Sequence, residues 1–259
     1  MSRDETVTYE YTDAVATLTI NDPQRRNPLG FDTIEGLIGG LRRGIDDPEV
    51  AVIVITGAGD STFSAGGDLA SGFFDDPIGR HAERGRFADL LRLLWRGGKP
   101  TVARVNGHAL AGGFGLAVAC DITICVDDAK LGLPEVRVGL WPMMITVALL
   151  RAMPQKAALE LMLTGRTITP DEALRLGAVS RVVPRGLLDE AVSETVGSLR
   201  NAPAAVMLGR DAFMSVASTD PDTALDRLQA GLTAVAATAD AREGVAAFAE
   251  RRTPRFVGE

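Results

Sequence analysis

Residues 51–56 constrain the fold more strongly than any other part of the chain. They read Ala-Val-Ile-Val-Ile-Thr, so five consecutive side chains are apolar and most are β-branched. A strand that is apolar at every position has to be covered on both faces, as in a parallel sheet flanked by helices. Residues 14–20 alternate between apolar and other side chains, which predicts a second, half-buried strand. We therefore expect a mixed α/β core.

A helix is expected between these two strands. Apolar residues recur at helical spacing from Phe31 to Ile45. Asp32 is the predicted N-cap, with Glu35 three residues later completing a capping box. The next expected elements are a polar irregular stretch, a helix and two strands, at residues 71–86, 87–95, 101–106 and 122–126.

The chain beyond Glu135 is expected to be almost wholly helical. Thr169 is the predicted cap of one of its helices. Residues 187–252 contain helical runs that are broken at Pro203 and Pro221. Strands with interleaved helices followed by helices alone predict an α/β fold with a C-terminal helical part.

The composition excludes several function classes. The net charge is -7, which argues against a nucleic-acid-binding surface. Cys120, Cys125, His81 and His108 are the only cysteines and histidines in the chain. They are too few and too poorly spaced for a disulfide framework or a tetrahedral metal site. No Gly-x-Ser-x-Gly motif is present. An enzyme with this sequence has to use carboxylates and backbone amides.

The location of the protein is expected to be cytoplasmic, without a membrane partner. The first six residues are polar or charged apart from Met1 and contain no apolar signal core. The apolar stretch that ends at Leu150 is too short to span a bilayer and is followed by Arg151.

Two glycine-rich segments have the features of a reactive site. Residues 63–69 follow the apolar strand, and residues 106–115 lead into a helix expected to end near Cys120. Glycines allow a ligand to approach the backbone closely, and free N–H groups at the start of a helix can hold an anion. Two such N–H groups converging on one oxygen would form an oxyanion hole. Either segment alone could also be a tight turn at a strand end.

A dinucleotide-binding fingerprint is incomplete at both places where it begins. The glycines of residues 57–59 are followed by Thr62, and those of residues 113–115 by Val118, where a third glycine is required. A nicotinamide-dependent oxidoreductase is therefore disfavoured.

Several short motifs occur together in a specific order along nearly the whole chain. They are Arg26-Asn27-Pro28-Leu29, residues 63–69, residues 106–113, Cys120-Asp121-Ile122, Pro134-Glu135 with Gly139-Leu140, Leu163-Thr164-Gly165, and residues 243–248. In these motifs the chain resembles the crotonase superfamily, also called the enoyl-CoA hydratase/isomerase family. The resemblance implies a spiral core of repeated ββα turns at residues 1–195, which holds the acyl-CoA site. It also implies a helical region at residues 196–259 that assembles homotrimers, or hexamers built from two trimers.

The resemblance also assigns roles to individual residues. The N–H groups of Gly67 and Gly112 would hold the thioester oxygen, and Glu135 would be the acid/base. Coenzyme A would enter as part of the substrate, without a separate cofactor or metal. The residues that it assigns to binding the substrate and its coenzyme are Arg25, Arg26, Leu29, Ala65, Asp68, Leu69, Trp141, Met143, Phe248 and Arg251.

Phe248 and Arg251 match positions that reach the coenzyme of a neighbouring subunit in the family. The alternative for these two is a helix packing residue and a solvated charge.

The chain departs from the family pattern at Gly115. Hydratases of the family carry a second glutamate there, three residues beyond the oxyanion glycine. Met143 also stands where the family tends to have glycine, which makes the segment bulkier and more apolar. One carboxylate suffices for double-bond isomerisation, because a single base can remove a proton from one carbon and return it to another. An apolar surrounding would raise the pKa of Glu135 and favour this proton shuttle.

Other reactions stay open at this point. Hydration is the default by family frequency, and a loop carboxylate could replace the missing glutamate. The candidates for that role are Asp68, Asp75, Asp76 and Glu83. Another crotonase reaction on a branched acyl-CoA and a catalytically weak acyl-CoA-binding homologue are further alternatives. We expect an acyl-CoA enzyme of the hydratase/isomerase type.

Overall fold

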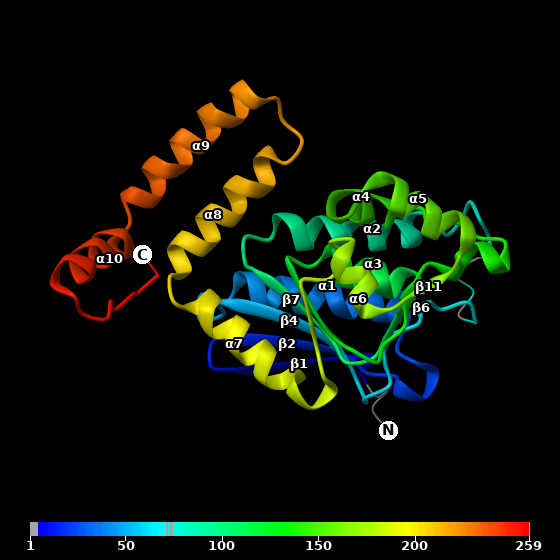
Figure 1. The fold of residues 1–259 in the computed structure, drawn as a ribbon. Coiled ribbons are helices and arrows are strands. Elements are labelled where there is room, and N and C mark those ends of the chain that lie inside the picture. The colour runs from blue at the N-terminus through cyan, green and yellow to red at the C-terminus, as the bar shows by residue number, and fades with distance from the viewer. Residues whose placement is uncertain (1–4, 71, 73–74, 259) are drawn as a thin grey trace.

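The computed structural model describes residues 5–70, 72 and 75–258. Its largest sheet has the strand order β1-β2-β4-β7-β9-β12 (Figure 1). β1 pairs with β2 in antiparallel orientation, and all other neighbours in this sheet are parallel. Its strands are β1 (Val7–Thr12), β2 (Val15–Ile20), β4 (Val52–Gly57), β7 (Thr101–Val105), β9 (Ile122–Val126) and β12 (Arg181–Val183). All six residues of β4 are buried, as expected for a strand covered on both faces.

Short strands follow three of these long strands and form a second sheet with the order β11-β10-β8-β5. The chain passes from β4 to β5, from β7 to β8 and from β9 to β10, so each turn of the spiral adds one strand to both sheets. A third, two-stranded sheet pairs β3 with β6 in parallel. These strands are β3 (Pro28–Leu29), β5 (Thr62–Ser64), β6 (Gly66–Gly67), β8 (His108–Leu110), β10 (Leu131–Gly132) and β11 (Thr167–Ile168).

Helices connect the turns of this spiral and pack on its sheets (Figure 1). Phe63 of β5 and Phe114 of α3 are fully buried at the centre of the core. The helices of the core are α1 (Phe31–Asp46), α2 (His81–Arg96), α3 (Gly112–Ala119), α4 (Thr146–Ala152), α5 (Gln155–Thr164), α6 (Pro170–Arg175) and α7 (Leu188–Arg200), with short 3-10 turns η1 (Pro23–Arg25), η2 (Pro134–Val138) and η3 (Arg185–Leu187).

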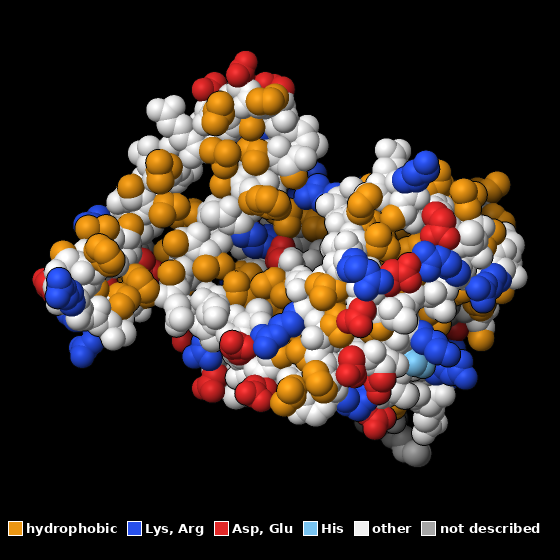
Figure 2. Space-filling model, viewed as in Figure 1, with side chains coloured by type: hydrophobic (Ala, Val, Ile, Leu, Met, Phe, Trp, Pro, Cys, Tyr) orange, Lys and Arg blue, Asp and Glu red, His pale blue; other side chains and the backbone are white. Residues whose placement is uncertain are grey.

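Three further helices extend away from the core: α8 (Pro203–Val216), α9 (Pro221–Ala236) and α10 (Ala239–Glu250) (Figure 1). Hydrophobic side chains gather along them and around the hollow that separates them from the core (Figure 2). Leu232 is 69% exposed and Phe248 is 88% exposed. Large apolar side chains this exposed are typical of a surface that another molecule covers. Within the described part of the chain, no helix is long and apolar enough to cross a membrane.

Most of the expected elements are confirmed. The strands expected at residues 14–20, 51–56, 101–106 and 122–126 are present within one or two residues. The helix after the second glycine-rich segment ends at Ala119, with Cys120 as its C-cap. Thr169 caps α6, because its hydroxyl accepts a hydrogen bond from the N–H of Glu172.

The predicted cap of α1 is wrong. The helix begins at Phe31, so its N-cap is Gly30, and no side chain caps it. Asp32 lies inside the first turn, where its charge still complements the helix dipole. Glu35 does not complete a capping box: it pairs with Arg86 of α2 across the helix interface, with Nη2 donating to Oε2 at 3.0 Å.

The prediction of an irregular stretch at residues 71–86 is wrong for its last six residues. These residues are helical, because α2 already begins at His81. Apolar periodicity starts only at Phe87, because residues 81–83 are exposed and residues 84–86 are only partly buried. Residues 71, 73 and 74 lie outside the described part of the chain. The expectation of an almost wholly helical second half is also wrong in part. β11 and β12 are short strands in that half, and they extend sheets that begin earlier in the chain.

Asn27 is fully buried and joins two loops of the core. Its Nδ2 donates to the carbonyl oxygens of Ala58 at 3.0 Å and Thr62 at 2.7 Å. Its Oδ1 accepts from the N–H of Asp22 at 3.0 Å. The φ of 53° at Asn27 is in the left-handed region, which asparagine tolerates better than most residues. The loop after β4 is thereby tied to the segment that leads into β3.

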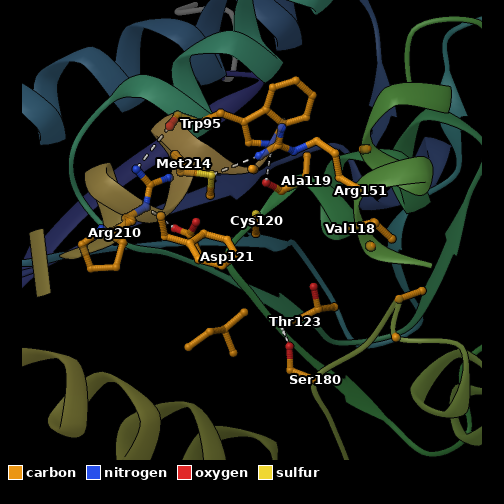
Figure 3. Close-up of a pocket in the computed structure, with 18 of the residues that line it drawn as sticks. Trp95, Val118, Ala119, Cys120, Asp121, Thr123, Arg151, Ser180, Arg210 and Met214 are labelled. Carbon is orange, nitrogen blue, oxygen red and sulfur yellow. Dashed lines mark hydrogen bonds and ion pairs between the residues drawn. The ribbon is translucent and has the colours of Figure 1, made fainter. Parts of the chain in front are cut away.

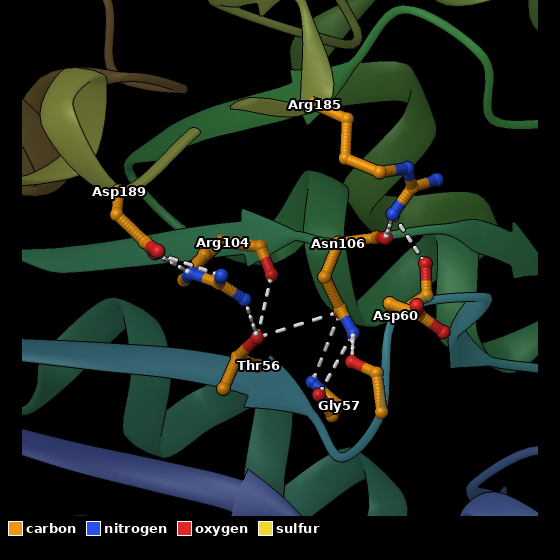
Figure 4. A network of polar contacts seen from close by, with 8 residues as sticks. Thr56, Gly57, Asp60, Arg104, Asn106, Arg185 and Asp189 are labelled. Carbon is orange, nitrogen blue, oxygen red and sulfur yellow. Dashed lines mark hydrogen bonds and ion pairs between the residues drawn. The ribbon is translucent and has the colours of Figure 1, made fainter. Parts of the chain in front are cut away.

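Asn106 holds the same loop from the other side (Figure 4). Its Nδ2 donates to the carbonyl oxygens of Gly57 at 2.9 Å and Gly59 at 2.6 Å. Arg185 donates to the carbonyl oxygens of Asp60 and Asn106. These contacts leave little freedom to the chain between β4 and β5, and therefore to the glycines of β6 that follow.

Candidate active site

A cavity of about 530 Å³ opens beside the N-terminus of α3. The strands β3 and β6, the helix α2, the turn η2 and residues 140–145 all contribute to its wall. The wall is mainly apolar, and its charged members are Glu135, Arg84 and Arg137. An apolar cavity with a few convergent polar groups is the usual form of a small-molecule site.

Gly67 and Gly112 both line this cavity. Gly112 is the first residue of α3, where the N–H groups have no acceptor within the helix and carry the positive end of its dipole. A Cβ on Gly112 would lie 3.8 Å from the backbone nitrogen of Gly67, so the two amides are close neighbours. The two glycines that the sequence singled out are therefore brought together.

Gly66 makes this approach possible. Its φ is +90°, and a Cβ at this position would lie 2.6 Å from the Cβ of Ala111 and 3.0 Å from the nitrogen of Gly112. Any side chain here would push the two turns apart. The glycine-rich character of both segments thus has a direct steric reason.

Glu135 lies in η2, directly after Pro134. Its Oε2 is buried and has no hydrogen-bond partner within the described residues. Burial raises the pKa of the Glu135 carboxyl, and a backbone hydrogen bond offsets part of this effect. Glu135 as a whole is only partly buried and lines the cavity, so this desolvated carboxyl is a candidate acid/base.

Comparisons with known proteins identify the family of the chain. The family model described as enoyl-CoA hydratase/isomerase matches residues 10–259. Crotonyl-CoA hydratase from Syntrophomonas wolfei is 36% identical over 259 residues, covering 98% of this chain and 99% of that protein. Carnitinyl-CoA dehydratase from Salmonella arizonae is 37% identical over 219 residues, covering 82% and 84%. The crystal structure of enoyl-CoA hydratase from Bacillus anthracis has a TM-score of 0.93 at 31% identity, covering 98% of this chain and 100% of that chain.

The chain belongs to the enoyl-CoA hydratase/isomerase family. The expected crotonase-like fold is confirmed by the same comparisons, since the structural match extends over almost the whole chain.

Five of the residues that the sequence assigned to substrate binding line the cavity: Leu29, Ala65, Leu69, Trp141 and Met143. Leu29 is buried, whereas Leu69 and Met143 are exposed.

Three of the other assigned residues lie in the adjoining loops and do not line the cavity. Arg25 and Asp68 form an ion pair, with Nη2 lying 2.7 Å from Oδ1. Arg26 is exposed, with a left-handed φ of 67°.

The remaining assigned residues lie far along the chain. Phe248 and Arg251 are on α10 and at its C-cap, and neither lines the cavity of its own chain. A role at a neighbouring subunit stays a prediction for both.

The loop carboxylates considered as a second acid/base do not line the cavity. Asp68 pairs with Arg25, and Asp76 Oδ1 accepts from the N–H of Gly79 at 2.9 Å. Asp75 and Glu83 are also outside the wall. Glu135 is thus the only acidic side chain in the wall, as far as the described residues show.

Other wall residues were not found from the sequence. Arg84 and Phe87 come from α2, and their spacing of three would have placed them on one helix face once the start of that helix was known. Met144 and Ile145 belong to an apolar run whose direction depends on how η2 and α4 pack. No pattern within the run distinguishes a wall residue from a core residue.

A larger cavity, of about 870 Å³, lies between α8 and the core (Figure 3). Several of its polar side chains bind other groups of the protein, although Asp121 Oδ1 is buried without a hydrogen-bond partner within the described residues. Asp121 Oδ2 accepts from Arg210 Nε at 2.8 Å and from the N–H of Thr101 at 2.7 Å. Arg151 lies over the ring of Trp95. None of the residues that the sequence assigned to catalysis lies here, so we place the reactive site in the smaller cavity.

The raised pKa of Glu135 predicts a stability effect with a definite sign. The folded protein holds this proton more tightly than the unfolded chain does, so protonation of Glu135 stabilises the fold. This stabilisation is complete below the pKa that Glu135 has in the unfolded chain, and it is lost as the pH rises through the pKa that it has in the folded protein. Glu135→Gln should therefore raise Tm at pH 7 by a few degrees, because it removes a charge whose burial destabilises the fold. The gain should vanish near pH 4.

Thermal unfolding of both proteins at the two pH values would measure this difference. Glu160→Gln is the matched control, since Arg166 holds the pKa of Glu160 below its usual range. This control should not gain stability at pH 7. A lower Tm for Glu135→Gln at pH 7 would contradict the prediction.

Proposed function

We propose that the protein catalyses proton transfer next to the thioester of an enoyl-CoA. The observation that carries this proposal is the convergence of Gly67, Gly112 and Glu135 on one apolar cavity. Two amide N–H groups can stabilise negative charge on the thioester oxygen, and the desolvated carboxylate of Glu135 can accept and return a proton. Family membership supports an acyl-CoA substrate.

Double-bond isomerisation is the reaction that this site supports best. Glu135 takes a proton from C2 of a 3-enoyl-CoA, and the electron pair of the broken C–H bond delocalises onto the thioester oxygen. The amides of Gly67 and Gly112 hold the resulting dienolate. Glu135 then gives its proton to C4, and the product is a 2-enoyl-CoA of the same composition. One carboxylate completes the cycle without water.

Hydration is the second candidate, and the names of the relatives favour it. Crotonyl-CoA hydratase and carnitinyl-CoA dehydratase are both named for adding or removing water. In such a reaction the oxygen of water would bond to C3 and a proton would be delivered to C2. Glu135 would have to assist both steps, because the wall offers no second carboxylate among the described residues.

Coenzyme A enters this proposal as part of the substrate, and the chemistry needs no separate cofactor. The loops that carry Arg25 and Arg26 adjoin the cavity mouth through Leu29 and Leu69, so we place the coenzyme there. We also propose a cytoplasmic location. Cys120 and Cys125 support it, because both are buried and they are not joined in a disulfide.

We further propose that residues 196–259 form an oligomerisation region that joins three or six copies. The exposed apolar side chains of α8, α9 and α10 support this, because they extend beyond the core that residues 1–195 form. The proposed contact between Phe248 and Arg251 and a neighbouring coenzyme depends on this assembly.

The products test the proposed reaction. Purified protein should convert a 3-enoyl-CoA into an isobaric 2-enoyl-CoA, whereas a hydratase would add the mass of one water to a 2-enoyl-CoA. Glu135→Gln should lower turnover by about 10²–10⁴-fold, because it removes the acid/base. Mass spectrometry with reference compounds identifies the products. Full activity in Glu135→Gln would overturn the mechanism, and binding without turnover across an acyl panel would leave only a binding protein.

Gly67 allows a separate test of the oxyanion hole. A Cβ at this position meets nothing within 4 Å, so Gly67→Ala keeps the N–H at no steric cost. Gly67→Pro removes the N–H and should lower kcat by about 10²–10³-fold. Steady-state kinetics of both variants, with circular dichroism as a check on folding, would measure the difference. Equal losses in the two variants would speak against an N–H role.

The oligomeric state is directly measurable. Sedimentation of the full chain should give three or six times 27.3 kDa. Leu232→Asp, which places a charge on the exposed apolar face of α9, should shift the protein toward the monomer. Ala230→Asp is the control and should not, because Ala230 is exposed and lies two residues before Leu232, on the opposite side of the same helix. A stable wild-type monomer would refute the assembly.

A further inference from the structure

Gly115 marks a position in α3 where no side chain fits. It lies three residues after Gly112, hence on the same side of the helix, and it is buried. A Cβ at Gly115 would lie 2.1 Å from Cγ2 of Ile145 and 2.4 Å from its Cβ. Atoms in protein interiors pack no closer than van der Waals contact, so even alanine would force a shift.

Ile145 is therefore the residue that fills this space. It is 3% exposed, it stands at the N-cap of α4, and it lines the same cavity as Glu135. The wall beside the first turn of α3 thus consists of a branched hydrocarbon side chain. Gly115 and Ile145 act as a pair, because the missing side chain of one makes room for the other.

We propose that Ile145 determines which reaction the enzyme performs, by occupying the space that a second carboxylate at Gly115 and its water would need. This inference rests on the proposed function. A water held in a protein interior makes about three hydrogen bonds to polar groups. Ile145 and Gly115 have no polar side-chain atom to offer it. The proton on Glu135 is then returned to carbon, and the hydroxyl of water is not added to C3.

The steric part can be tested without any enzyme assay. Ile145→Gly removes both blocking atoms, whereas Ile145→Val keeps both. Gly115→Ala should lower Tm in the wild-type and Ile145→Val backgrounds by several degrees. In the Ile145→Gly background the same change should not lower Tm. A similar Tm loss in all three backgrounds would overturn the steric pairing.

The catalytic part is tested by the ratio of hydrated to isomerised product. Gly115→Glu combined with Ile145→Gly should raise this ratio at least about tenfold over wild type, a threshold set below the roughly 10²-fold that an added acid/base contributes at the low end. Gly115→Glu alone should not raise it. Ile145→Ala opens space without adding a carboxylate, so it should raise the ratio by a smaller factor. If the double variant does not fold, the product ratio of Ile145→Ala alone tests the inference.

An unchanged product ratio in folded Ile145→Ala and in the folded double variant would overturn the inference. A tenfold rise in Gly115→Glu alone would do the same, because Ile145 would then be no obstacle. Wild-type protein without turnover on either substrate would instead refute the proposed function and the catalytic part with it. The Tm comparison would still decide the steric part, so the two failures are distinguishable.

Discussion

The close approach of two backbone turns is the constraint on which the site depends. Gly66 at the end of one turn meets Ala111 and Gly112 at the end of the other, with no room for a Cβ between them. This contact brings two amide groups from distant parts of the chain next to each other. Asn27 and Asn106 both bind the loop between β4 and β5, which leads into the first of these turns.

Two opposite electrostatic effects meet in the cavity. The N-terminus of α3 offers N–H groups and a positive dipole end, which stabilise negative charge. Glu135 sits in an apolar wall that disfavours its own negative charge and raises its pKa. In the proposed reaction these two effects favour the movement of negative charge from the carboxylate to the thioester oxygen. Ile145 adds a hydrocarbon side chain to the same wall.

Local patterns were sufficient for the elements whose residues are strongly biased. The apolar run of β4 and the cap at Thr169 were predicted because each depends on its own residues. The start of α1 was misjudged, since a cap depends on which residue leaves the helical conformation and not only on its side chain. β12 was missed because a three-residue strand owes its existence to the neighbour β9 with which it pairs.

The sequence by itself determined the family, because ordered motifs run along nearly the whole chain, and the same motifs predicted roles for Gly67, Gly112 and Glu135. It also showed that residue 115 is a glycine, at the position where hydratases of the family carry a second glutamate. Only the tertiary structure decided what occupies that space. Ile145 is 30 residues away from Gly115 in the chain. Their contact exists because α3 and α4 pack together, and packing between distant segments leaves no local signal in either one.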